Sequence, residues 1–292
     1  MDTSRRASVL AAAIALVALP LRAQSPFPRP VSPARPLGSP AKAPLRLPSP
    51  SSVMWIAAHP DDEVLAAPLL ARWCRDGRAR CSLLTATRGG SGACLLPGGC
   101  PPDLATVRSG EAGASSQYFG ANAILMSLPD DGGGVAPPSW AIGAGGSPEL
   151  VATVAAFIRA EAPELVLTFD PRHGTTCHPD HRAIAAVVLE AVKLLSAPPA
   201  VYLLETRVEV DAQPFALRFR SGAPGAMLFD ANGSLVSIGG PAWNAVAADM
   251  ERHPSQFDAA WLAAVSRVPA ADRAVYLAPA STILQQPAST CP

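Results

Sequence analysis

The sequence has no excess of either charge, few aromatic residues and no long apolar run. Lys and Arg number 23, as do Asp and Glu, and aromatic residues make up 5% of the 292-residue chain. Nucleic-acid-binding domains usually carry a basic excess, and a membrane-spanning helix needs about 18 consecutive apolar residues. These absences argue against a nucleic-acid partner and against a membrane span.

Residues 1–23 have the pattern of a secretory signal peptide. Arg5 and Arg6 form a short basic region, the apolar run Val9–Leu19 follows, and Ala23 offers a small residue for cleavage. The pattern predicts export, to the periplasm or the medium, with no membrane span left after the signal is removed. The paired arginines fit the twin-arginine route, and an ordinary Sec signal or an uncleaved anchor fits the same residues.

A proline-rich segment follows the predicted signal. Residues 24–50 contain nine prolines in 27 residues, a composition that keeps a chain extended and solvated. We interpret this segment as a linker, so the folded domain is expected to cover residues 51–292.

Six cysteines in an exported chain predict disulfide bonds. Cys74 with Cys81 and Cys94 with Cys100 each bracket a short loop, and Cys177 and Cys291 are left as a third pair that would tether the C-terminus. The spacings do not form two C-x-x-C clusters, which argues against a cysteine zinc site.

Short apolar runs alternate with helical patterns over the first two thirds of the domain. This alternation predicts an α/β fold of Rossmann-like type, a mostly parallel sheet with helices on both faces. The expected strands are 53–58, 81–86, 123–128, 165–169 and 201–204, and the expected helices are 63–75, 105–119, 148–161 and 180–195.

The pattern changes after about residue 207. Residues 215–219 alternate like a half-buried antiparallel strand, and Asn232-Gly233 is typical of a hairpin turn. Residues 243–250 and 256–265 indicate two closing helices. We therefore expect a small antiparallel extension at the C-terminal end of the fold.

Two histidine motifs follow predicted strands. His59 opens H-P-D-D-E after the first strand, and His178 opens H-P-D-H after the fourth strand and before a long helix. Ligands of open parallel sheets bind beyond the carboxyl ends of the strands. Both motifs are therefore expected at one edge of the sheet.

The spacing inside each motif suits a metal site. His59 and Asp62 are three residues apart, as are His178 and His181, and residues three apart share one face of a helical turn. Two imidazoles and a carboxylate are typical of a hydrolytic zinc site, and carboxylates left over beside them could act as a general base. The alternative is two proline-containing loops whose aspartates cap helices.

These motifs resemble the two signature blocks of the PIG-L/LmbE-like zinc-dependent de-N-acetylases. The blocks are W-I-A-A-H-P-D-D-E-V-L at 55–65 and L-V-L-T-F-D-P-R-H-G-T-T-C-H-P-D-H-R-A-I-A at 165–185. Weaker similarities lie at T-A-T-R-G-G, R-S-G-E (108–111), S-L-P-D-D-G-G and R-H-P-S-Q-F (252–257), in the family's order. The resemblance spans about residues 53–265.

The resemblance implies a role for each matching residue. Its zinc ligands would be His59, Asp62 and His181. Asp61 would be the general base for a metal-activated water, and His178 would stabilise the oxyanion. Asp180 would orient a neighbouring histidine. The substrate contacts would be Arg108 and Asp131. Arg88 follows the second expected strand and therefore faces the same edge of the sheet, so it is a further candidate for substrate contact, with an ion pair as the alternative.

The implied activity is hydrolysis of the acetamide of an N-acetylglucosamine-type sugar, whether a small molecule or an oligosaccharide. Zinc is the expected cofactor, although two histidines and a carboxylate also suit Fe²⁺. The alternatives are a zinc hydrolase of another acyl amide, lipid- or antibiotic-linked, and a non-catalytic metal- or sugar-binding module. Among the other candidates, we expect a hydrogen-bonded loop residue at His173, a helix-end contact at His253, and either loop packing or a sugar platform at Trp140.

Overall fold

The computed structural model describes residues 49–130, 140, 146–212, 215–224, 226–283 and 291. The predicted signal peptide, nearly all of the predicted linker and Asp131 lie outside this part of the chain. Within it, none of the helices combines the length and hydropathy that a bilayer span requires.

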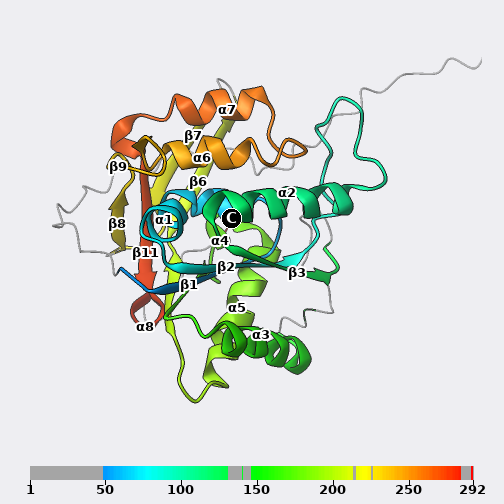
Figure 1. Cartoon of the computed structure of the whole chain (residues 1–292), viewed down its shortest axis with the longest axis vertical. Coiled ribbons are helices and arrows are strands. Elements are labelled where there is room, and N and C mark those ends of the chain that lie inside the picture. Colours follow the sequence, from blue (N-terminus) through cyan, green and yellow to red (C-terminus); the bar gives the residue numbers. More distant parts are fainter. Residues whose placement is uncertain are drawn as a thin grey trace, which may run out of the picture.

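A seven-stranded sheet forms the centre of the fold, in the order β3-β2-β1-β4-β5-β11-β8 (Figure 1). The first five strands in this order are parallel to one another, and β11 is antiparallel to both β5 and β8. These strands are β1 (Ser52–Ala57), β2 (Arg80–Thr87), β3 (Asn122–Leu128), β4 (Leu165–Phe169), β5 (Ala200–Leu204), β8 (Met227–Asp230) and β11 (Ala274–Pro279).

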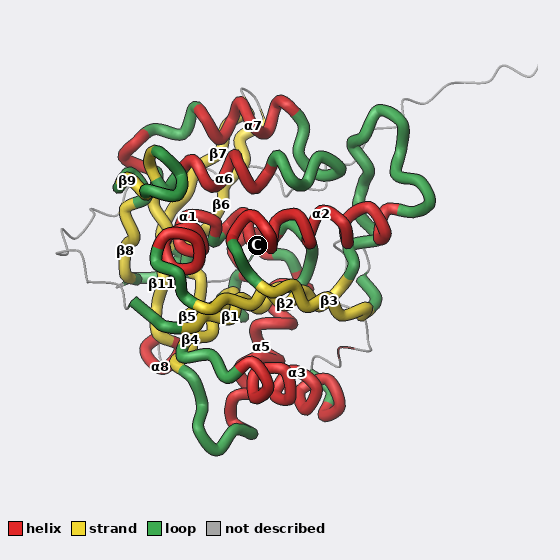
Figure 2. The backbone as a smooth tube through the Cα atoms, viewed as in Figure 1, coloured by secondary structure: helices red, strands yellow, loops and turns green. Residues whose placement is uncertain are grey.

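Helices cover both faces of the sheet (Figure 2). In Figure 1, α1 and α2 lie on one side of the sheet with α6 and α7 beyond them, and α3 and α5 lie on the other side. The helical elements are η1 (Asp62–Leu65), α1 (Ala67–Leu70), η2 (Ala71–Asp76), α2 (Leu104–Phe119), α3 (Pro148–Glu161), α4 (Gly174–Cys177), α5 (Pro179–Lys193), α6 (Asn244–Met250), α7 (Ala259–Ser266), η4 (Ala270–Asp272) and α8 (Ala280–Ile283).

Two small antiparallel sheets complete the C-terminal part. A hairpin joins β6 (Thr206–Ala212) to β7 (Phe215–Ser221), and β9 (Ser234–Leu235) pairs with β10 (Gly240–Pro241). The architecture confirms the expected fold class, a mostly parallel α/β sheet with an antiparallel extension.

The adjacency of β1 and β4 brings the two histidine motifs together. All six residues of β1 and all five of β4 are buried, as expected of central parallel strands. Parallel pairing aligns Val53 with Leu165 and Trp55 with Leu167. The segments that follow the two strands therefore leave the sheet at the same edge.

Two local predictions differ from the structure. The expected helix 63–75 is divided into η1, α1 and η2, and Pro68, which lacks an amide hydrogen, lies in the first turn of α1. The turn at Asn232-Gly233 does not close a hairpin, because β8 pairs with β11 and β9 with β10. There Asp230 accepts hydrogen bonds from the backbone and side chain of Asn232, which turns the chain locally.

Three disulfide bonds join the six cysteines. Cys74–Cys81 and Cys94–Cys100 pair as their loops suggested, and Cys177 pairs with Cys291 across 114 residues. Disulfides persist in oxidising compartments, so the structure fits an export environment.

Candidate active site

The two histidine motifs meet in one pocket at the carboxyl ends of β1 and β4. Its wall includes His59, Asp61, Asp62, His178 and His181. Asp180 is buried directly behind them. The structure therefore brings together the six residues that the sequence suggested as metal ligands and catalytic groups.

The first turn of α5 positions three of these residues. His178 is the N-cap of α5, and its Nδ1 accepts a hydrogen bond from the Asp180 amide at 3.2 Å. Because Nδ1 is an acceptor, the neutral ring carries its proton on Nε2. Burial, with His181 and His59 nearby, lowers the pKa of His178 to about 3. The side chain is thus a neutral hydrogen-bond donor on the pocket wall.

Asp180 fixes the orientation of the His59 ring. Its Oδ2 lies 3.0 Å from His59 Nε2, and its side chain is fully buried. Asp180 therefore engages Nε2, and the other ring nitrogen, Nδ1, faces Asp62 at 3.8 Å from Oδ2. A carboxylate on the far nitrogen of an imidazole is the usual support of a metal-binding histidine.

His181 is held by the backbone of α4. Its Nδ1 lies 2.9 Å from the Gly174 carbonyl, so this nitrogen donates to that oxygen and Nε2 is the ring nitrogen that faces the pocket. Gly174 has φ +52°, and a Cβ there would lie 2.8 Å from the Cβ of His181. Only glycine allows this close approach. The Nε2 of His181 lies 2.9 Å from Asp62 Oδ1, in an ion pair with that carboxylate.

Asp62 completes the group of ligand atoms. Its Oδ2 accepts hydrogen bonds from the amides of Ala58 and His59 at 2.9 and 2.8 Å. Burial acts to raise the pKa of Asp62, but His181 and His59 hold it well below its usual range. The residue is therefore an ionised carboxylate that faces the inner ring nitrogens of both imidazoles.

This donor set fits a divalent metal ion. Ring nitrogens of His59, His178 and His181 lie within 4.8 Å of one another, and Asp62 contacts two of these rings. Hydrogen bonds on their far sides orient the rings of His59 and His181 toward Asp62. Imidazole nitrogen with carboxylate oxygen is a ligand set for zinc and for ferrous iron.

Asp61 has a strained backbone beside this cluster. Its φ of 103° lies in the left-handed region, which is uncommon for residues other than glycine. Its amide donates to Glu63 Oε2 at 3.2 Å. Burial raises the pKa of the Asp61 carboxyl, against the opposing effect of Arg108. Strain of this kind is frequent at functional sites.

Arg108, a predicted substrate contact, binds Asp61. Its guanidinium donates to the carbonyls of Gly89 and Pro60, and its Nη2 lies 2.9 Å from Asp61 Oδ1. The residue is only 5% exposed, although it reaches the pocket wall. These contacts indicate that Arg108 fixes the carboxylate of Asp61.

Two other residues were predicted to contact substrate, Arg88 and Asp131. The first lines a second pocket, and the second lies outside the described residues. Arg88 is exposed, donates from Nε to Ser109 Oγ and lines the second pocket. Asp131 is outside the described residues, but its neighbour Asp130 lines both pockets. Ser91 binds Asp130 through its amide and hydroxyl. The repeated aspartate of S-L-P-D-D-G-G was the signal that could have pointed to Asp130.

Sequence reasoning missed the role of His253. It is fully buried, and its Nε2 lies 2.9 Å from Glu63 Oε1, while the other oxygen of Glu63 binds the Asp61 amide. Burial acts to lower the pKa of His253, but the Glu63 carboxylate raises it to about 9. The expected helix-end contact is therefore an ion pair that supports Asp61, and its partner lies 190 residues away.

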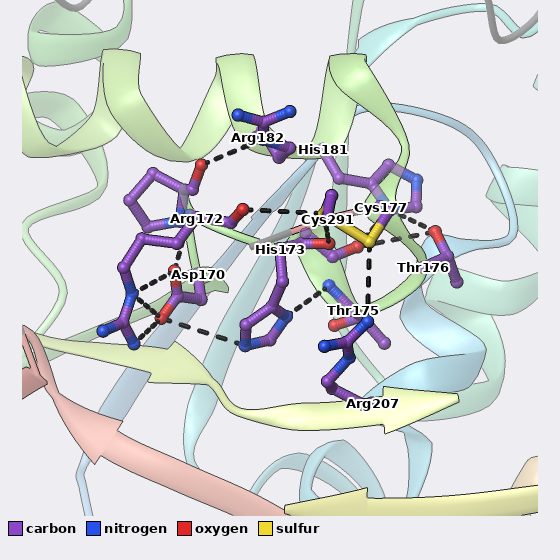
Figure 3. Close-up of a disulfide and its surroundings, with 12 residues drawn as sticks. Asp170, Arg172, His173, Thr175, Thr176, Cys177, His181, Arg182, Arg207 and Cys291 are labelled. Atoms are coloured by element: carbon purple, nitrogen blue, oxygen red, sulfur yellow. Dashed lines mark hydrogen bonds and ion pairs between the residues drawn. A yellow bond between two sulfur atoms is a disulfide. The ribbon is translucent and has the colours of Figure 1, made fainter. Parts of the chain in front are cut away.

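The third disulfide lies beside the loop that carries the second motif (Figure 3). Cys177 directly precedes His178 in this loop, and it bonds to Cys291. His173 accepts a hydrogen bond from the Thr175 amide and lies 3.3 Å from Glu205. His173 is thus a hydrogen-bonded loop residue. Trp140 is fully buried in the hydrophobic core and donates to the Pro129 carbonyl, so it is a packing residue.

Comparisons with known proteins place these observations in context. Residues 54–192 match the family model described as PIG-L, GlcNAc-PI de-N-acetylase. A 1D-myo-inositol 2-acetamido-2-deoxy-alpha-D-glucopyranoside deacetylase from Kineococcus radiotolerans is 32% identical over 170 residues. That match covers 51% of this chain and 46% of the relative, so the chain spans about half the length of the curated relative.

Solved structures share the fold at low sequence identity. The N,N'-diacetylchitobiose deacetylase from Pyrococcus horikoshii is 17% identical, with a TM-score of 0.53 and 73% of both chains covered. The 4-carboxy-2-hydroxymuconate hydratase GalB from Pseudomonas putida is 15% identical, with a TM-score of 0.56 over 82% of this chain and 98% of that one. One neighbour is a deacetylase and the other a hydratase, so the fold alone does not decide the reaction.

Proposed function

Residues 54–192 belong to the PIG-L family, and from this premise we propose that the protein is a zinc-dependent hydrolase of N-acetylglucosamine-type sugars or glycoconjugates. It removes the acetyl group and releases acetate and a free amine. The family match supports the amide as the bond that is cleaved. The observation that carries the proposal is the convergence of His59, Asp62 and His181, with Asp61 beside them.

In this proposal His59, Asp62 and His181 hold the metal ion. Asp180 and the Gly174 carbonyl occupy the far nitrogens of the two rings, so the near nitrogens face the Asp62 carboxylate, and a bound cation would replace the protons that they share with it. When bound, the ion supplies a Lewis acid that polarises a carbonyl and lowers the pKa of a coordinated water.

Asp61 is the proposed general base. Its carboxylate is held by Arg108, and its backbone is held by Glu63. A raised pKa brings a carboxylate closer to neutral pH, where it accepts a proton in one step and returns it in the next. In this scheme Asp61 takes the proton of the attacking water and then delivers it to the leaving amine.

His178 is the proposed donor to the oxyanion. Its Nδ1 is engaged by the Asp180 amide, so its proton lies on Nε2. A preset donor of this kind stabilises negative charge that develops on the carbonyl oxygen. Because the ring is already neutral, it can donate a hydrogen bond without changing its own charge.

An assay of acetate release tests the function. Purified protein, reconstituted with one equivalent of Zn²⁺ or Fe²⁺, is incubated with N-acetylglucosamine, its glycosides and its oligomers, and acetate release is measured. Chelation should abolish the release and metal addition should restore it. Release with one metal only would identify the cofactor. Failure to hydrolyse any amide would favour a non-catalytic metal- or sugar-binding module.

We also propose that the protein is exported and loses residues 1–23. The three disulfides support an oxidising destination. Expression with its own N-terminus, followed by N-terminal sequencing of the periplasmic and secreted fractions, tests this. Cleavage after Ala23 is the expected result. Substitution of Arg5 and Arg6 by lysine should block export by the twin-arginine route and spare export by the Sec route.

A further inference from the structure

The pocket beside the candidate metal centre has two unlike halves. A cavity of about 340 Å³ extends from the histidine cluster. One half is lined by polar groups that include Asp130 and Gln256, which are both hydrogen-bonded to the segment 91–93. The other half is lined by apolar side chains of the β6–β7 hairpin and the segment around α7, namely Val208, Val210, Leu217, Phe219, Phe257 and Trp261.

The β6–β7 hairpin presents one apolar face to this cavity. Val208 pairs with Phe219 and Val210 with Leu217 across the two strands, and all four side chains line the pocket. Alternate residues of a strand point to opposite faces.

The opposite face of the hairpin is charged. Arg218 lies 2.7 Å from Asp211, and Arg220 lies 3.1 Å from Glu209. These four residues are well exposed, with side-chain exposures between 39% and 54%. The alternation therefore distinguishes a solvent face from a face turned toward the candidate metal centre.

Aromatic side chains extend the apolar half. Phe257 and Trp261 meet edge to face with centroids 5.6 Å apart, and Phe215 meets Trp261 at 5.0 Å. Phe257 and Trp261 are only partly buried, as are Val208 and Val210. Apolar surface that remains accessible inside a pocket gains free energy when an apolar group covers it.

An amide joins an amine-side substituent to an acyl group, and we match the first to the polar half of the pocket and the second to the apolar half. The amine-side substituent of the proposed substrate is a sugar, whose hydroxyls need hydrogen-bonding partners such as Asp130 and Gln256. The acyl substituent extends from the other side of the carbonyl carbon. If the sugar lies in the polar half, the acyl group points into the apolar half. An acetyl group has one methyl and would leave most of that surface uncovered.

We propose that the preferred substrate carries an N-acyl chain longer than acetyl, and that the apolar half of the pocket binds this chain. The inference rests on the proposed amide hydrolysis and adds its acyl specificity. Hydrolysis breaks the C–N bond, adds the elements of water and releases a fatty acid and the amino sugar. The apolar half would equally accept an alkyl aglycone if the substrate lay in the opposite orientation, and the experiment separates these cases.

The experiment compares two homologous series on the metal-reconstituted enzyme. In the first series, N-acetyl, N-butyryl, N-hexanoyl and N-octanoyl glucosamine vary the acyl chain. In the second, methyl, butyl and octyl glycosides of N-acetylglucosamine vary the aglycone. We expect kcat/KM to rise about four-fold for each acyl methylene that becomes buried, and to change little with the aglycone.

Two results would overturn the inference and leave the proposed function intact. One is hydrolysis of the acetyl substrate with no gain on lengthening the acyl chain. The other is a gain along the aglycone series alone. If no amide in either series is hydrolysed, both the inference and the proposed function fail.

A variant pair tests which surface is responsible. Val210→Thr keeps the side-chain volume but puts a hydroxyl on the apolar face, and it should lower the ratio of octanoyl to acetyl kcat/KM by several-fold. Glu209→Gln is the matched control, because its side chain lies on the charged outer face, and it should leave that ratio unchanged. Equal loss of the ratio in both variants would contradict the assignment.

Binding of the acid product gives a readout that does not depend on turnover. Octanoate should bind wild-type protein more tightly than acetate, with the negative heat-capacity change that marks burial of apolar surface. Titration calorimetry at several temperatures measures both quantities. Equal affinity for the two acids would contradict the inference.

Discussion

Substitution of Asp61 by Asn separates proton transfer from metal binding. Asn keeps the shape of the side chain and tolerates a left-handed backbone better than Ala does, which matters at φ 103°. The amide cannot take a proton from water. Loss of a general base lowers kcat by about 10²–10⁴, equivalent to about 3–5 kcal/mol of activation free energy.

The effect of Asp61→Asn on stability should be small. Arg108 still donates hydrogen bonds to the carbonyls of Gly89 and Pro60 in this variant. The side-chain carbonyl of the introduced asparagine can accept the hydrogen bond that Arg108 gives to Asp61 in the wild type. Burial of the Asp61 carboxylate acts against its charged form and raises its pKa, so a neutral side chain removes that cost. We expect the free energy of unfolding to change by about 1 kcal/mol, the scale of one hydrogen bond.

The assay follows three quantities on one preparation: metal content, kcat and the denaturant midpoint. The variant should bind metal like the wild type and lose its activity. Wild-type kcat should rise with pH as the base loses its proton, and the residual kcat of the variant should lack this step. Glu209→Gln, which removes one negative charge on the outer face of the hairpin, controls for net charge. Normal turnover by Asp61→Asn, or inactivity caused by loss of metal, would refute the reasoning.

Three further predictions concern the metal, the buried ion pair and the disulfides. His181→Ala removes the nitrogen that faces Asp62 and should abolish stoichiometric metal binding; elemental analysis that finds it fully loaded would exclude His181 as a ligand. The pKa of His253 is raised to about 9 from 6.5, so protonated His253 stabilises the folded protein fully below pH 6.5, and this contribution is lost as pH rises through 9. His253→Gln should remove up to about 3 kcal/mol of this pH dependence of the unfolding free energy, measured by denaturant unfolding. Thiol titration of the denatured, unreduced protein should find no free cysteine, and six free thiols in the wild type would contradict the disulfide assignment. Cys291→Ser opens a loop of 114 residues and should lower the free energy of unfolding by up to about 5 kcal/mol.

The ion pair of His253 and Glu63 shows how the site depends on remote contacts. Glu63 binds the Asp61 amide with one oxygen and His253 with the other. His253 in turn lies 4.0 Å from Glu111, which accepts two hydrogen bonds from Ser255. The backbone that orients the proposed base is therefore supported by side chains from α2 and from the loop after α6.

The sequence by itself determined the parallel sheet and the two motifs at its edge. Unbroken apolar runs such as 53–58 become central strands because both faces of a parallel sheet are buried. Pro179 favours the first position of a helix, so the sequence placed His178 at the N-cap of α5 and His181 in its first turn. The i, i+3 spacing then puts both histidines on one face of that turn. These are local rules, so one sequence was sufficient.

Only the tertiary structure decided the partners of these residues. Asp180 binds His59 across 121 residues and His253 binds Glu63 across 190, and no local pattern encodes which carboxylate meets which imidazole. Arg108, predicted as a substrate contact, lines the pocket, and its guanidinium also lies 2.9 Å from Asp61. Strand β11 was not foreseen, because its place between β5 and β8 depends on pairing with distant strands. The apolar half of the pocket likewise exists only because the hairpin and α7 fold over the edge where the histidines meet.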